Sequence, residues 1–232
     1  PEVIGFQPNL TPVYYLPTSL AFTQQPEDTD LGETLSSQPI VTVYDEIGQI
    51  ATQFVGTITL ALGNNPGAGV LTGTLTELCV AGQASFTDLA VTLDGGTGFT
   101  LVASAAEPIA GATSAAFDIA NPLPVLGAMN PIFTAAGSGD LALTLSGSGF
   151  VKSSVVKWGE SETLVPTAVD AESITVTVPA NLLTTARTAA VTVFSPAAGG
   201  GTSSALTFTI TPDAQASEVW VDDDWTGYGD CG

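Results

Sequence analysis

The chain has 232 residues with 44% hydrophobic side chains and a mean hydropathy of +0.37, which excludes an intrinsically disordered protein. Its 23 acidic residues stand against three basic ones, Lys152, Lys157 and Arg187, and the net charge of −20 excludes nucleic acid as a partner. The sequence contains no histidine, which excludes Ser-His-Asp and Cys-His catalytic sites and Cys/His zinc sites, and no apolar run is long enough to span a membrane.

Residues 1–17 are expected to form an extended N-terminal arm. The arm contains Pro1, Pro8, Pro12 and Pro17, and it has no partner strand of its own. We expect its apolar residues to add as a strand to a sheet edge or groove of an adjacent subunit. These residues are Val3, Ile4, Phe6, Leu10, Val13, Tyr14, Tyr15 and Leu16. Asn9 begins an Asn-Leu-Thr glycosylation sequon. Because the chain starts at Pro1 and not at Met, we interpret it as a processed product or a fragment.

Beyond the arm, short alternating runs bounded by Gly, Pro, Asn and Asp predict an all-β protein with many short antiparallel strands. Asp45, which ends one such run, is interpreted as part of a hairpin turn and Trp158 as a core residue. At most two helical turns are expected, in "PANLLTTA". The predicted strands lie in "PIVTVYD", "GTITLAL", "QASFTDLAV", "FTLVAS", "LALTLSGSGF", "SITVTV" and "AAVTVFS".

A proline-rich stretch, "NPLPVLGAMNP", is interpreted as a stiff extended linker, because proline cannot continue a strand ladder. It places a domain boundary near Asn121 and Pro122 and leaves two domains, residues 18–121 and 122–212, followed by a C-terminal tail, residues 213–232. Each domain then has the size of one immunoglobulin-like sandwich of about 100 residues. The expected fold is two tandem immunoglobulin-like antiparallel β-sandwiches with an extended N-terminal arm and a short C-terminal strand.

The tail, which ends in "VWVDDDWTGYGDCG", suggests two kinds of site. Asp222, Asp223, Asp224 and Asp230 are candidate calcium ligands, but their spacing lacks the EF-hand pattern, and the alternative is an acidic, solvated connector. Trp220 lies in a "VWV" strand that needs a sheet to join and is a candidate assembly residue.

The two cysteines, Cys79 and Cys231, are candidates for a disulfide within one chain or between neighbouring chains. A buried free thiol at Cys79 is the alternative. We expect no catalytic site, no metal and no cofactor.

The second half resembles an IPT/TIG domain, an immunoglobulin-like fold of secreted and cell-surface proteins. The resemblance rests on "LSGSGF", "VVKWG", "VPANLL" and "GGGTS". There Gly147 and Gly149 would allow a sharp bend after a strand, Phe150 would enter the core and Pro179 would end a strand. The first half is similar to bacterial surface-protein immunoglobulin-like repeats, through "LAFTQQPEDTDLGETLSSQPIVTVYDEIGQIAT" and "GTLTELCVAGQASFTDLAV", with Cys79 as a departure. Over about ten residues, "EVWVDDDW" is similar to the start of secreted parallel β-helix proteins.

Both families are architectural, so these resemblances imply spacing and joining rather than catalysis. The charged fraction of 11%, against about 25% in ordinary soluble proteins, leaves three explanations for the surface. It is buried in an assembly, covered by glycans, or simply neutral and polar. We predict an extracellular or cell-surface structural protein that pairs with itself head to tail in a filament, pilus or surface layer. The alternatives are accessory spacer domains of a secreted carbohydrate-active enzyme and an adhesin stalk.

Overall fold

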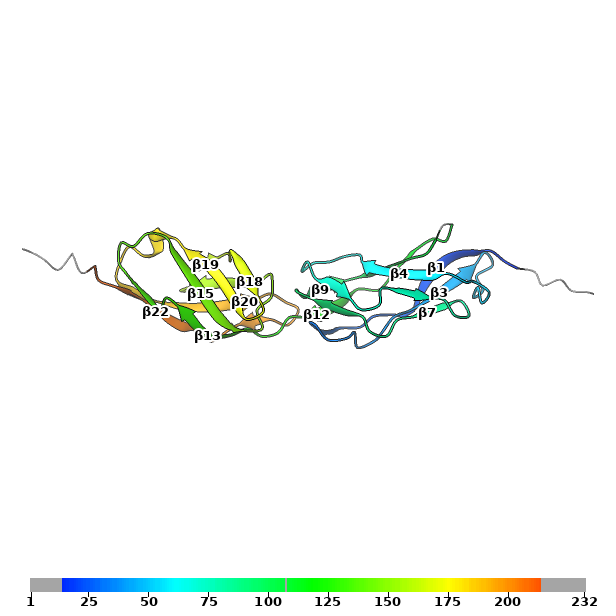
Figure 1. The fold of residues 1–232 in the computed structure, drawn as a ribbon, viewed down its shortest axis with the longest axis horizontal. Helices are drawn as coiled ribbons and strands as arrows, with labels where there is room; N and C mark the ends of the chain where they lie inside the picture. Colours follow the sequence, from blue (N-terminus) through cyan, green and yellow to red (C-terminus); the bar gives the residue numbers. More distant parts are fainter. Residues whose placement is uncertain (1–13, 107, 214–232) are drawn as a thin grey trace, which may run out of the picture. The chain divides into compact units, whose positions relative to one another are not determined.

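The computed structural model describes residues 14–106 and 108–213, which form two compact units of β-sheet (Figure 1). The first unit runs to Pro122 and also includes two short segments from later in the chain, Val151–Ser153 and Pro196–Gly200. The remaining described residues form the second unit. Each unit has its own core of buried apolar side chains.

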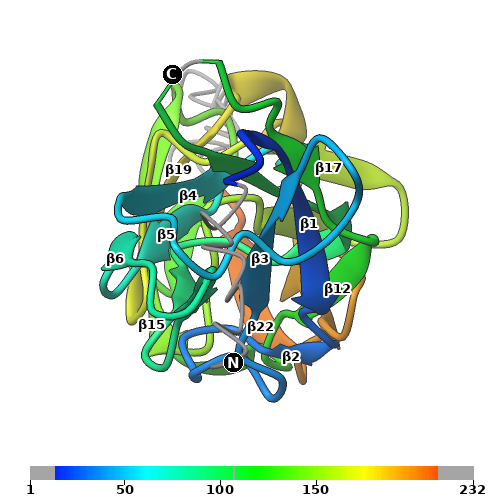
Figure 2. The ribbon, with the colours of Figure 1, turned by 90° about the vertical axis from the view of Figure 1, so that its right-hand side faces the viewer.

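Four short sheets build the first unit. Neighbouring strands are antiparallel except for one parallel pair, β2 with β12. In order across each sheet, the strands are β1 (Pro17–Gln24), β3 (Ile40–Asp45) and β7 (Gln83–Ser85); β11 (Ala112–Thr113), β10 (Leu101–Ser104), β4 (Thr57–Leu62) and β6 (Thr76–Leu78); β2 (Thr29–Asp30), β12 (Phe117–Ala120) and β9 (Gly96–Phe99); and β5 (Val70–Thr72) with β8 (Ala90–Thr92). Figure 2 shows β1 beside β3.

The first core forms because apolar and polar residues alternate along the strands and therefore point to opposite faces of each sheet. In β4, Ile58 and Leu60 are buried, whereas the threonines that alternate with them are exposed. Phe99 and Phe117 meet inside this core, with their ring centroids 6.1 Å apart.

Two sheets build the second unit, with one parallel pair, β14 with β22, among its described strands. The first sheet runs β13 (Val125–Asn130), β15 (Leu141–Ser148), β19 (Ser173–Val178) and β18 (Ala168–Asp170). The second runs β14 (Phe133–Ala135), β22 (Leu206–Thr211), β20 (Arg187–Ser195), β16 (Val155–Trp158) and β17 (Glu162–Leu164), with β21 (Gly201–Thr202) also paired to β20. Figure 1 shows β15 beside β19.

The second core is centred on Trp158, which is 2% exposed and packs against Phe208 with ring centroids 5.0 Å apart. Phe150 is buried in the same core, and β19 ends directly before Pro179. The single predicted helical piece is a 3-10 turn, η1 (Ala180–Leu182). Trp158 therefore belongs to the core, as the alternating strand predicts.

Three local predictions need correction. The proline-rich stretch is not linker throughout, because Val125–Asn130 forms β13, which tolerates its flanking prolines as an outer strand paired only with β15. The run "QASFTDLAV" is two strands, β7 and β8, separated by residues 86–89. Gly149 has the positive φ of a bend, 70°, but Gly147 does not.

The predicted all-β class with two tandem sandwiches is confirmed for the part of the chain that the structure describes. Residues 1–13 of the predicted arm and the predicted C-terminal strand lie outside the described residues.

Candidate functional site

Two acidic side chains of the described residues, Asp45 and Asp140, accept hydrogen bonds from nearby backbone N–H groups. Asp45 Oδ1 accepts hydrogen bonds from the backbone N–H groups of Ile47 (3.1 Å) and Gln49 (2.8 Å), which confirms the hairpin turn predicted at this residue. Asp140 Oδ1 accepts a bond of 2.8 Å from the N–H of Ala180. Within the described ranges, no three His, Cys, Asp or Glu side chains are grouped to hold a metal ion.

Asp94 is the acid with the most unusual surroundings. It is 2% exposed, and its Oδ1 accepts a hydrogen bond of 2.7 Å from the hydroxyl of Ser153 in the same unit. Burial raises the pKa of the Asp94 carboxyl above its ordinary value, although the bonds from Ser153 and Gly95 act in the opposite direction. Asp94 therefore carries a desolvation penalty when it is ionised.

We expect Asp94→Asn to raise the melting temperature of the protein at pH 7. The pKa of Asp94 is higher in the folded protein than its unfolded-state value of about 3.9. Proton binding at Asp94 therefore favours the folded state, and this contribution to stability is fully present below the unfolded-state pKa. This contribution is lost as the pH rises through the folded-state pKa. The asparagine amide does not ionise, so the variant does not lose stability in this way. Thermal unfolding from pH 3 to pH 7 should show the variant gaining on the wild type as the pH rises.

Asp88→Asn is the matched control, because the pKa of Asp88 is lowered by hydrogen bonds from the backbone and hydroxyl of Thr74. Its contribution is present above the unfolded-state pKa and is lost on acidification. Asp88→Asn should therefore lower the melting temperature at pH 7. A change of melting temperature in the same direction for both variants would contradict the pKa shifts assigned to Asp94 and Asp88.

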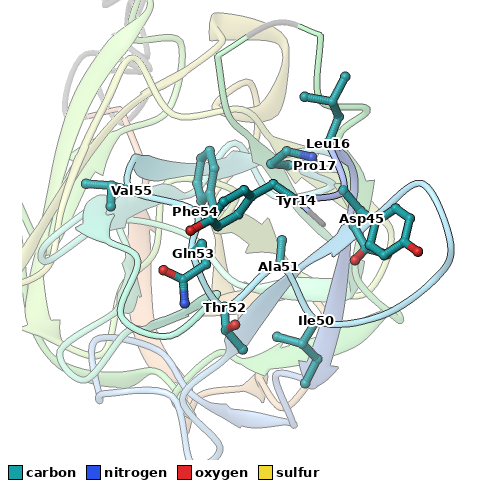
Figure 3. Close-up of a pocket in the computed structure, with 11 residues that line it drawn as sticks. Tyr14, Leu16, Pro17, Asp45, Ile50, Ala51, Thr52, Gln53, Phe54 and Val55 are labelled. Carbon is teal, nitrogen blue, oxygen red and sulfur yellow. The ribbon is translucent and has the colours of Figure 1, made fainter. Parts of the chain in front are cut away.

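An apolar groove lies at the end of the first unit where β1 begins (Figure 3). Its volume is about 380 Å³. One side is residues 14–17, the base of the predicted arm, and the other is residues 50–55, which connect β3 to β4. Figure 3 shows Tyr14 reaching toward Phe54 and Gln53. Apolar rings and aliphatic chains thus form most of a site that is open to solvent.

Backbone hydrogen bonds hold the two sides of this groove in place. The N–H of Glu46 donates to the carbonyl of Leu16 at 3.0 Å, which ties the base of the arm to the turn after β3. In residues 50–55, the N–H of Ala51 donates to Val43 O and that of Phe54 to Ala51 O, both at 2.9 Å. The groove is therefore built by the first unit itself.

Several apolar side chains that line the groove are exposed, and we call this set the tip patch. Val55 is 85% exposed and Tyr14 is 70% exposed. The members of the tip patch are Tyr14, Tyr15, Leu16, Ile50 and Val55.

The predicted site residues divide between the described and the remaining parts of the chain. Tyr14, Tyr15 and Leu16 are brought together at the tip patch. Cys79 is 5% exposed and forms no disulfide with another described residue, and burial raises the pKa of its thiol. The other predicted residues lie outside the described residues: Val3, Ile4, Phe6, Asn9, Leu10, Val13, Trp220, Asp222, Asp223, Asp224, Asp230 and Cys231.

Sequence reasoning missed the far side of the groove. No role is predicted for residues 50–55 from the sequence, because their apolar members do not alternate as strand residues do. The available signal was Val55, an apolar residue in the connection between two strands.

Comparisons with known proteins agree with the fold. The family model of the IPT/TIG domain matches residues 124–210. A solved structure of the Yersinia pseudotuberculosis adhesin InvE is 13% identical, with a TM-score of 0.51, over 82% of this chain and 58% of the InvE chain. The present chain thus spans less than two thirds of the InvE chain, and at this identity the likeness shows the fold alone.

A second solved structure, SGBP-B from a xyloglucan utilization locus of Bacteroides uniformis, is 16% identical with a TM-score of 0.31, over 84% of this chain and 49% of that one. A comparison with curated proteins found no match. No helix among the described residues is long and apolar enough to cross a membrane. The chain has an immunoglobulin-like fold, and its residues 124–210 match the family model of the IPT/TIG domain.

Proposed function

We propose that this chain is an extracellular structural protein whose copies join head to tail into a filament, pilus or surface layer. The two immunoglobulin-like units are architectural modules in this proposal, and they act without catalysis. The N-terminal arm of one copy adds as a strand to the next copy. Heterologous contacts of this kind generate open polymers, because a growing polymer always has one unpaired donor at one end and one unpaired acceptor at the other.

The observation that carries the proposal is the tip patch at the base of the arm. Monomeric soluble proteins rarely leave a large contiguous apolar surface exposed, and such surfaces mark interaction sites. Here Tyr14 and Leu16 are 70% and 69% exposed at the start of the described chain, next to an apolar groove. The arm therefore begins at a surface with the composition of a protein–protein contact.

The composition of the whole chain supports the same conclusion. Only 11% of residues are charged, which suits a surface that is largely covered in an assembly. If half of the eight apolar arm residues are buried on assembly, at about 1.5–3 kcal/mol each, the gross gain is roughly 6–12 kcal/mol. Ordering the arm offsets part of this gain. The similarity of fold to the adhesin InvE supports an extracellular location.

The second candidate is a set of accessory spacer domains in a larger secreted enzyme or adhesin stalk. It is favoured by the length comparison, since the similarity covers only 58% of the InvE chain. A spacer of this kind would remain monomeric on its own. The oligomeric state of the chain separates the two candidates.

Deleting residues 1–13 should abolish the polymer and leave both units folded, because every described strand begins at or after Pro17. Light scattering and electron micrographs would follow assembly, and circular dichroism would follow folding. A second deletion, of residues 1–16, also removes one side of the tip groove.

The two deletions test different parts of the mechanism. Loss of assembly in both is expected. Loss only when residues 14–16 are removed would assign assembly to the tip patch in place of the arm. Unchanged assembly in both would exclude the arm and the tip patch as the assembly elements, whereas a wild-type chain that is monomeric would favour the spacer candidate.

A further inference from the structure

The second unit has its own exposed apolar groove, at the outer strand β14. Ile132 is 60% exposed and Phe133 is 59% exposed, although both are large apolar residues. With three threonines of the neighbouring strand β22, Thr207, Thr209 and Thr211, they line a groove of about 370 Å³. No charged side chain lines it.

The backbone of β14 is open on the side away from β22. The N–H of Thr209 donates to Ile132 O at 3.1 Å, and the N–H of Ala136 donates to Thr211 O at 2.8 Å. In a parallel pair the residues that bond to the neighbour alternate along the strand, so 132, 134 and 136 face β22. The N–H and C=O of Phe133 and the N–H of Ala135 therefore point away from β22, toward the edge of the sheet.

Several other outer strands carry devices that block pairing. Charged residues lie in β6 (Glu77), β17 (Glu162) and β18 (Asp170), and a bulge interrupts β13 between Leu126 and Ala128. The outer edge of β1 is occupied by Ala110, which exchanges hydrogen bonds with Thr18 and Leu20. Strand β14 has no charge and no bulge, and its exposed Phe133 offers an apolar anchor.

We propose that the β14 edge of one copy is the acceptor for residues 2–7 of the N-terminal arm of a second copy. This inference rests on the proposed function and assigns its acceptor. The incoming strand would pair with the backbone of Phe133 and Ala135 and place its apolar side chains in the groove beside Phe133 and Thr209. Strand addition of this kind takes affinity from the backbone and specificity from alternate side chains.

Residues 2–7, "EVIGFQ", suit this groove better than the C-terminal tail does. They contain no proline, and Ile4 and Phe6 are two residues apart, so a strand would place both on one face. Glu2 is their only charge. The tail instead carries Glu218, Asp222, Asp223, Asp224 and Asp230, which an uncharged groove would desolvate without compensation.

The length of the arm also fits. Residues 8–16 separate the proposed donor strand from β1, and in an extended proline-rich conformation of about 3.1 Å per residue they span roughly 28 Å. That distance lets a donor strand reach beyond its own unit. Pro8 directly after the donor strand would end the pairing, since proline cannot donate to a ladder.

The test uses the full chain with one end disabled at a time. Phe133→Glu disables the acceptor, and the pair Ile4→Asp with Phe6→Asp disables the donor. Each variant alone should raise the concentration needed for assembly at least about tenfold. Mixed in equal amounts, the two variants should form a dimer, because the mixture retains one working donor and one working acceptor per junction. Sedimentation velocity would measure both results.

Val165→Glu is the matched control, because Val165 is 76% exposed in the same unit but lies beyond β17. It should assemble as the wild type does. Phe133→Glu should keep the wild-type melting temperature, since the side chain lies at the surface. A lowered melting temperature with intact assembly would mean that the chain's own tail covers the groove, which overturns the proposal.

The remaining outcomes separate this inference from the proposed function. Normal assembly of Phe133→Glu, together with failure of the donor variant, would overturn the β14 acceptor and leave arm-mediated assembly standing. Normal assembly of the donor variant would overturn both, as would a wild-type chain that stays monomeric at every concentration.

Discussion

Trp158→Ala should lower the free energy of unfolding of the second unit by about 3–5 kcal/mol, the cost of removing a large buried ring. Trp158 is 2% exposed, and the tilted Phe208 ring beside it would face a cavity. Because single domains are stable by only about 5–15 kcal/mol, this loss is a large part of the total. Urea unfolding followed by circular dichroism would measure it, as a fall in the midpoint of the second unit's transition.

Two further substitutions sharpen this test. Trp158 Nε1 is buried without a hydrogen-bond partner in the described structure, and such a donor costs about 1–3 kcal/mol. Trp158→Phe keeps an aromatic ring and removes this donor, so it should cost much less than alanine. Phe99→Ala, in the first core, should instead shift the transition of the first unit. Equal losses for Trp158→Phe and Trp158→Ala would contradict the packing argument.

Gly147→Ala should destabilise the second unit by about 2–3 kcal/mol or more, through overpacking against backbone that cannot rotate away. Gly147 lies opposite Leu126 in the pairing of β15 with β13. A β-carbon there would overlap the carbonyl oxygen of Val125 and lie 2.7 Å from the Phe150 ring. The strands must separate or shift to accept it, and calorimetry would record a lower melting temperature.

Gly139→Ala is the matched control for this prediction. Gly139 precedes the same strand, no atom lies within 4 Å of the position that its β-carbon would take, and its φ is not in the left-handed region. Alanine there should be neutral or should stabilise the unit by up to about 1 kcal/mol, because it restricts the unfolded chain. A comparable loss at both positions would show that close approach at Gly147 is not the cause.

Much of the fold could be predicted because a strand leaves a local pattern in its own residues. In "TITLAL" and "SITVTV" the buried residues are the alternate apolar ones, such as Ile58 and Ile174, with 0% exposure each. The second half resembles an IPT/TIG domain in its short motifs, and the family model matches residues 124–210.

Local patterns failed where distant contacts decide the outcome. Prolines on both sides of β13 argued for a linker, yet Val125–Asn130 pairs with β15 because an outer strand needs hydrogen bonds on one side only. Gly147 was interpreted as a bend residue, whereas its role is to let β13 approach, which depends on a strand some twenty residues earlier.

The sequence by itself determined the class of the molecule, an all-β protein of two sandwiches with alternating strands. Its lack of histidine also excluded histidine-based catalytic sites and Cys/His zinc sites. The apolar arm residues Tyr14–Leu16 could also be identified without a structure. Only the tertiary structure decided that residues 50–55 face them across a groove, and that β14, with Phe133 exposed, is an open edge free of charge and bulge. The physical reason is that alternation reports which face of a strand is buried, whereas the strand that becomes an edge is decided by pairing between residues far apart in the chain.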